Sequence, residues 1–135
     1  MIREPRKPII IPEDVKPSRD FLKVDGVFNC GAAKLGDEYI LLCRVAESCR
    51  EQEEGYVNIP VYDERAERLK IERISLEEIR NRYDMSDSRM IYRKNAGGIK
   101  KIKYLTSISH LRLARSRDGI HFKMDEQPAL PLQGR

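Results

Sequence analysis

Two side chains of complementary chemistry lie fifteen residues apart near the start of the chain. Asn29 precedes a run of small residues at 31–33, and Arg44 stands near the end of the apolar segment 39–45. An asparagine amide both donates and accepts hydrogen bonds, whereas an arginine guanidinium is a fixed fork of donors that keeps its charge. Brought together by a fold, these two residue types suggest a site for a neutral polyol and an oxyanion.

Each of these residues also has a purely structural interpretation. An asparagine at a turn commonly bonds its own backbone. An arginine on an edge strand extends its head group to water or pairs with a nearby carboxylate, for which Glu47 is the candidate. The histidines are expected to be packed or surface residues, because His110 has no carboxylate or thiol at ligand spacing and His121 is similar.

Length and composition indicate one globular domain or part of one. The chain has 135 residues, of which 40% are hydrophobic and 36% charged, with apolar residues in ordered patterns. No stretch approaches the roughly 20 apolar residues of a membrane span, so no membrane partner is expected. The cysteines at 30, 43 and 49 are odd in number, lack metal spacing and follow no secretory segment. Reduced thiols in a cytoplasmic protein are therefore predicted.

The excess of positive charge gives an alternative function. The net charge is +4, and much of the surplus falls between Arg89 and Lys103. A small basic β module that binds nucleic acid would use such a cluster. However, only Tyr92 and Tyr104 supply aromatic rings there, and no helix-turn-helix or oligonucleotide-binding signature is present. A solvated loop is the preferred interpretation, and nucleic acid is not an expected partner.

The elements that would position the site are short strands joined by turns. Asp25-Gly26 and 35–38 are predicted turns, and Ser75 with Glu78 predicts a capped short helix that ends near Tyr83. The continuous apolar run of 39–45 predicts burial on both faces. Strands are expected at 39–45, 57–62 (with Pro60 at an edge or bulge), 69–74, 106–116 and 120–122, with a turn at 117–119.

Five features occur in one order along the chain. They are the segment Lys7–Pro12, Val27-Phe28-Asn29 with its small residues, the strand Leu41–Val45, the segment Leu113–Phe122 and the closing Pro128–Leu130. This ordered set resembles the N-terminal part of glycoside hydrolase family 130, the β-mannoside phosphorylases and related mannosidases. The resemblance covers nearly the whole chain except an insertion at about 51–103.

The resemblance implies an all-β fold. The chain would be the N-terminal portion of a five-bladed β-propeller, comprising the first blade and part of the second, with a small helical insertion. Residues 1–135 would form one segment of that domain. The helix and basic loop of the insertion at 51–103 would either cap the pocket or contact a neighbouring subunit of a homo-oligomer.

The resemblance also implies roles for the two opening residues. Asn29 matches the asparagine that holds the mannose in the cleaved subsite, and Arg44 matches the arginine at the phosphate end. In such enzymes phosphate attacks the anomeric carbon opposite the leaving sugar, an acid donates a proton, and configuration inverts. The implied partners are a β-mannoside oligosaccharide and inorganic phosphate as co-substrate, with no metal or organic cofactor.

The sequence departs from the family pattern in two places. Cys30 stands where a serine or proline is common, and it is a weaker hydrogen-bonding group. The proton donor of the family is an aspartate in a Glu-Asp-Pro-Arg motif, which this sequence does not contain. No catalytic residue is therefore assigned, the chain alone is expected to be inactive, and phosphorolysis and hydrolysis remain open alternatives.

Overall fold

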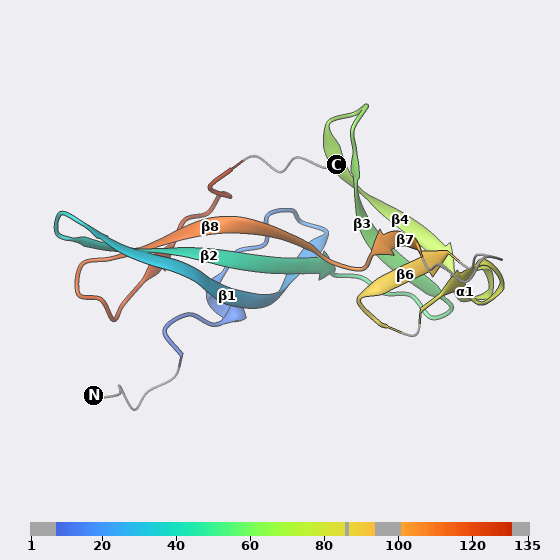
Figure 1. The fold of residues 1–135 in the computed structure, drawn as a ribbon, viewed down its shortest axis with the longest axis horizontal. Coiled ribbons are helices and arrows are strands. Elements are labelled where there is room, and N and C mark those ends of the chain that lie inside the picture. The colour runs from blue at the N-terminus through green and yellow to red at the C-terminus, as the bar shows by residue number, and fades with distance from the viewer. Residues whose placement is uncertain (1–7, 86, 94–100, 131–135) are drawn as a thin grey trace.

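The computed structural model describes residues 8–85, 87–93 and 101–130, with the backbone alone at positions 29, 30 and 101. Strands dominate, as predicted (Figure 1). In chain order the elements are the 3-10 helix η1 (Pro12–Asp14), β1 (Leu22–Leu35), β2 (Glu38–Cys49), β3 (Tyr56–Asp63), β4 (Arg68–Ser75), α1 (Leu76–Arg82), β5 (Tyr83–Asp84), β6 (Met90–Arg93), β7 (Lys101–Leu105), β8 (Ile108–Ser116) and β9 (Lys123–Met124).

The main sheet is a long, curled, antiparallel layer with the order β1-β2-β8-β9 (Figure 1). β1 and β2 form a hairpin in which Leu35 pairs with Glu38 across a two-residue loop. Gly36 occupies this loop with φ of +61°, a conformation that residues with a Cβ rarely adopt. The predicted turn at 35–38 is therefore confirmed.

β1 is longer than the sequence predicted, because Asp25-Gly26 is not a turn. The strand runs through both residues, and its register against β2 shifts between Val24 and Gly26. Such a shift is a β-bulge, in which Asp25 has no cross-strand residue opposite it on β2 while the strand continues. Asp-Gly suits a bulge as well as a turn, so the local sequence did not distinguish them. A second shift lies between Asn29 and Gly31.

β2 is the central strand of this sheet, and its burial alternates in its second half. Cys43, Val45, Glu47 and Cys49 are buried, whereas Arg44 is exposed. The prediction that the apolar run 39–45 is buried on both faces is therefore wrong for this chain. Residues 40–42 are half-buried.

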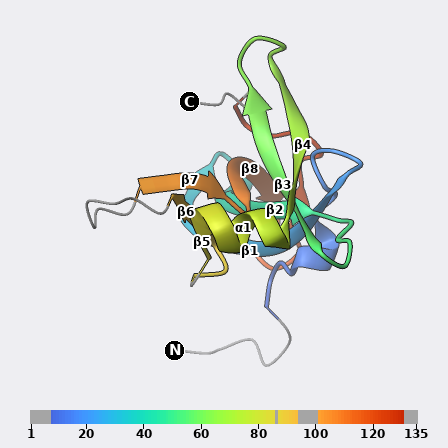
Figure 2. The same ribbon diagram turned by 90° about the vertical axis from the view of Figure 1, so that its right-hand side faces the viewer.

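The segment between β2 and β8 builds two smaller sheets and the helix. β3 pairs with β4, and β5, β6 and β7 form a three-stranded sheet. Figure 2 shows the far end of the β3–β4 hairpin projecting from the rest of this segment, whereas its other end lies beside α1. Their common core comprises Ile59, Ile74, Ile79 and Ile91. Because β3 pairs with β4 alone, Pro60 lies on an edge strand, as predicted.

The helix follows its predicted cap. The Ser75 hydroxyl accepts a hydrogen bond from the backbone N–H of Glu78 at 3.1 Å, and the helix ends before Tyr83. The strand expected at 120–122 is wrong by a few residues. The Asp118 carboxylate accepts backbone hydrogen bonds from Ile120 and His121, both at 2.8 Å, so these residues belong to the turn. β9 begins only at Lys123.

Candidate functional site

The hairpin of β1 and β2 brings the backbones of the two predicted site residues together. Phe28 pairs with Arg44, and the next step of the ladder pairs Asn29 with Cys43. Directly paired residues of antiparallel strands lie about 5 Å apart at their Cα atoms. Asn29 and Arg44, fifteen residues apart in the sequence, thus belong to adjacent pairs of one β-ladder.

Arg44 is an exposed side chain on the central strand of the main sheet. Its guanidinium carbon lies 4.6 Å from the centroid of the Phe28 ring, which is cation–π distance. The edge-strand interpretation of Arg44 is wrong, because β2 lies between β1 and β8. Pairing with Glu47 is also wrong, because that side chain is fully buried and binds other partners.

Glu47 belongs to a buried polar cluster that the sequence did not reveal. Its carboxylate accepts hydrogen bonds from the Ser18 backbone N–H at 2.7 Å and from the Ser18 hydroxyl at 2.5 Å. On β8, His110 Nδ1 lies 3.6 Å from Glu47 Oε2, and Arg112 Nη2 lies 2.9 Å from His110 Nε2. Arg112 Nη1 also donates to the Lys16 carbonyl at 2.6 Å. The cluster ties segment 16–18 to the main sheet.

The electrostatics of this cluster favour a neutral histidine. Burial lowers the pKa of His110; Glu47 opposes this shift, and Arg112 and Arg19 add to it. Because Arg112 keeps its protons, it donates to His110 Nε2, which places the histidine proton on Nδ1, toward Glu47. Burial also lowers the pKa of the Arg112 guanidinium. The negative charge of Glu47 then balances the positive charge of Arg112, and both side chains are fully buried.

The cluster was missed because its members are distant in sequence. Glu47 shares the inward face of β2 with Cys43 and Val45, and β8 pairs His110 with Val45 and Arg112 with Cys43. The available signal was the alternation of two polar residues, at 110 and 112, along a strand that needs one buried face. The prediction of a packed histidine holds for His110. His121 is exposed and lies 2.6 Å from Asp118.

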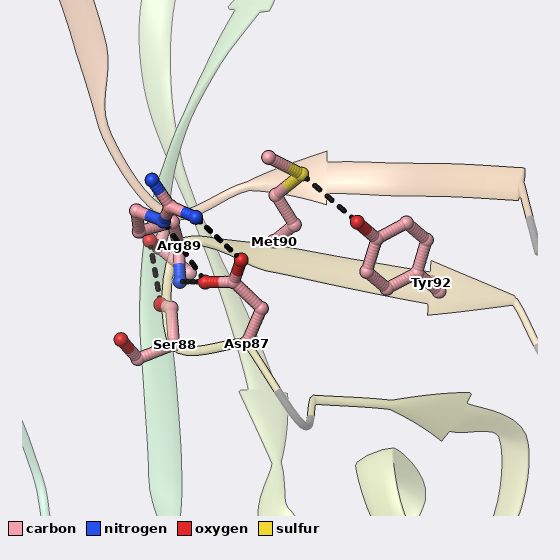
Figure 3. A network of polar contacts seen from close by, with 6 residues as sticks. Asp87, Ser88, Arg89, Met90 and Tyr92 are labelled. Atoms are coloured by element: carbon pink, nitrogen blue, oxygen red, sulfur yellow. Dashed lines mark hydrogen bonds and ion pairs between the residues drawn. The ribbon is translucent and has the colours of Figure 1, made fainter.

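The basic segment 89–103 contains a cation with its own counter-ion. Arg89 Nε donates to one Asp87 oxygen at 3.0 Å and Nη2 to the other at 2.8 Å, as Figure 3 shows. This bidentate contact lowers the pKa of the Asp87 carboxyl to about 2, mainly through the hydrogen bond from the Arg89 side chain. Arg89 is therefore partly neutralised, which weakens the nucleic-acid alternative. Residues 94–100 of this segment, where a chain break was predicted at 95–98, lie outside the described residues.

A hollow of about 550 Å³ lies where β3, β4 and β7 meet the start of β8. Its lining is mainly apolar and includes Arg89 and Lys103, with no carboxylate among the described residues. Arg44 does not line it. The hollow is thus separate from the hairpin that carries the predicted site.

Over the described ranges, His, Cys, Asp and Glu side chains form no group of three that could hold a metal ion. None of the helical segments in the same ranges has the length and apolar character needed to span a membrane.

The chain is similar in sequence and in fold to a mannobiose phosphorylase, which confirms the resemblance seen in the sequence. The chain is 40% identical to the β-1,2-mannobiose phosphorylase of Listeria innocua over 128 residues, or 95% of the chain and 35% of that enzyme. A solved structure of the Listeria enzyme with β-1,2-mannobiose matches with a TM-score of 0.76 and 39% identity, over 93% of the chain and 35% of that structure. The chain thus spans about a third of the length of this relative. No protein-family model matches the chain.

Proposed function

We propose that the chain is a segment of a carbohydrate-active enzyme that cleaves β-mannosides by inverting phosphorolysis. The chain would form the first blade and part of the second in a five-bladed propeller, with residues 51–103 as an insertion. The observation that carries the proposal is the ladder that pairs Phe28-Asn29 with Cys43-Arg44 in a chain 40% identical to a mannobiose phosphorylase. Asn29 would contact the sugar, and Arg44 would bind phosphate.

The geometry of Arg44 suits an oxyanion. The guanidinium is solvent-exposed, and the Phe28 ring lies against it at 4.6 Å from the centroid. A cation–π contact does not require the N–H donors of the guanidinium to bond a conventional acceptor, so these donors can still meet two phosphate oxygens. A hydrogen bond to a charged group contributes roughly 1.5–3 kcal/mol. The positive charge also offsets repulsion between phosphate and a nearby carboxyl group.

The proton donor has no candidate in this sequence. The Glu-Asp-Pro-Arg motif that carries the acid in the resembling enzymes is not among the 135 residues. We therefore expect the chain to bind phosphate and β-mannosides without cleaving them. Release of mannose 1-phosphate by the purified chain would show that the acid is present after all.

The test is calorimetric titration of the chain with inorganic phosphate and, separately, with β-1,2-mannobiose. Arg44→Lys keeps the charge but loses the planar fork, so phosphate affinity should fall by about tenfold while sugar affinity changes little. Arg44→Ala should abolish phosphate binding. Lys34→Ala, on the neighbouring strand β1, serves as the matched control. Equal losses for both ligands in the Arg44 variants would contradict the assignment of phosphate to Arg44.

A further inference from the structure

Phe28 is a large apolar side chain that the fold leaves 47% exposed. It precedes Asn29 in the chain and is the cross-strand partner of Arg44. Single exposed apolar residues are common and need no explanation by themselves. The ring of Phe28 is in contact with the guanidinium of Arg44, the cation to which phosphate binding is assigned.

The contact is fixed by the backbone rather than by a chance meeting of side chains. Phe28 and Arg44 are directly paired, so their side chains leave the sheet on the same face. The guanidinium carbon lies 4.6 Å from the ring centroid, well inside the roughly 6 Å over which a ring attracts a cation. The register of the hairpin therefore sets the stack.

Gly26 provides the space that the ring occupies. A Cβ added to Gly26 would lie 3.0 Å from both Cε2 and Cζ of Phe28, a tight contact that the ring could relieve only by shifting away. The bulge at 24–26 places Gly26 opposite Ala46, so a pair of small residues neighbours the Phe28–Arg44 pair. The ring thus lies back over Gly26 and presents its face to the guanidinium.

We propose that Phe28 is a positioning residue that holds the Arg44 guanidinium ready for an oxyanion. This inference rests on the proposed role of Arg44 in binding phosphate. An arginine free to sample its rotamers loses that freedom when it binds an anion, whereas a stacked arginine has already lost part of it. The ring attracts the cation without supplying a conventional hydrogen-bond acceptor, so N–H donors remain for phosphate and both contacts form together.

The first readout is phosphate affinity, measured by calorimetric titration of the 135-residue chain. Phe28→Leu keeps an apolar side chain but removes the ring, and it should weaken phosphate binding about fivefold, the size of an exposed cation–π contact. Phe28→Tyr keeps the ring and should stay within about twofold of the unmodified chain. Leu35→Ala, a 69% exposed apolar residue on the same strand, is the matched control and should change nothing.

The second readout reports the stack directly and does not need a ligand. In the NMR spectrum the Arg44 Nε–H resonance should be shifted by the ring current of Phe28, and Phe28→Leu should remove that shift. Gly26→Ala displaces the ring without changing Phe28. It should reduce both the shift and the phosphate affinity, with no further loss when combined with Phe28→Leu.

The outcomes separate this inference from the proposed function. Loss of phosphate binding in Arg44→Ala with no change in Phe28→Leu and Gly26→Ala overturns the positioning role and leaves the function of Arg44 standing. If the unmodified chain does not bind phosphate, or if Arg44→Ala binds it as tightly as the unmodified chain, both the positioning role of Phe28 and the phosphate role of Arg44 are overturned. Equal weakening of phosphate and β-1,2-mannobiose by Phe28→Leu shows general disruption and also overturns the positioning role.

Discussion

The carboxylate of Glu47 accepts two hydrogen bonds from one residue, the backbone N–H and the hydroxyl of Ser18, which precedes it by 29 positions. Glu47 is fully buried on the central strand β2, and Ser18 lies in the segment that leads into β1. This contact fastens the start of the chain to the main sheet. The negative charge of Glu47 also balances the positive charge of Arg112 in the cluster that contains His110.

Replacement of Glu47 by Gln should destabilise the fold strongly. The change removes the charge that balances Arg112, and an uncompensated buried charge costs about 3–5 kcal/mol. The free energy of unfolding from urea titration measures the effect. The exposed Glu54→Gln variant is the control and should be neutral within about 0.5 kcal/mol. A loss below 1 kcal/mol for Glu47→Gln would mean that the cluster tolerates an unbalanced guanidinium.

The folded chain should lose stability as the pH falls through the range in which histidine titrates. Burial lowers the pKa of His110 in the folded state, so the unfolded chain takes up a proton at this residue at higher pH. The stabilisation is complete above about pH 6.5, the ordinary histidine pKa, and is lost as the pH falls toward the folded pKa. The slope should approach but not exceed about 1.4 kcal/mol per pH unit.

This pH window separates His110 from the carboxylates. The pKa values of Asp87 and Asp118 are lowered by hydrogen bonds from Arg89 and His121, so their protonation removes stability only below about pH 4. Urea titrations at several pH values between about 5 and 8 therefore measure the contribution of His110 to stability apart from that of the carboxylates. His110→Gln should be less stable overall and should show no slope in this range. A slope that persists in this variant would assign the titration to another group.

The N-cap of α1 should contribute measurably to the smaller core. Ser75 accepts the hydrogen bond from Glu78 at 3.1 Å, and the helix buries Ile79 against Ile59, Ile74 and Ile91. Ser75→Ala should lower the free energy of unfolding by about 1 kcal/mol. Ser75→Asp preserves an acceptor at the cap and should stay close to the unmodified chain. Equal losses for both variants would show that the cap hydrogen bond is not the source of the effect.

The sequence predicted those parts of the fold that depend on local patterns. The Ser75 cap, the Leu35–Glu38 turn and the strand at 69–74 each involve residues close in the chain, and each is confirmed. The alternating burial expected along that strand is not found, because Leu69 and Ile74 are buried and Ile71 is exposed. Asp25-Gly26 was assigned wrongly because a bulge and a turn use the same residue types. The choice between them depends on whether the strand finds a partner farther along the chain.

The candidate site was predictable only in part, for the same reason. The types and spacing of Asn29 and Arg44 indicated the pair, and their backbone adjacency followed from the hairpin. The stack of Arg44 on Phe28 and the cluster around Glu47 depend on register, which aligns β2 with β1 on one side and β8 on the other. Register is a property of paired strands, so no single stretch of sequence displays it.

Cys49 should report the opening of the main sheet. The residue is fully buried at the end of β2, and burial raises the pKa of its thiol, so reaction with a thiol reagent needs both exposure and the thiolate. In the folded chain its labelling should be slow and limited by the population of opened molecules. Because Glu47→Gln destabilises the same strand by about 3 kcal/mol or more, it should accelerate labelling by on the order of a hundredfold at fixed pH. Peptide mass spectrometry assigns the label to Cys49, and labelling in concentrated urea gives the upper limit of the rate. Labelling of Cys49 in the unmodified chain at that limit would show that β2 does not stay packed in solution.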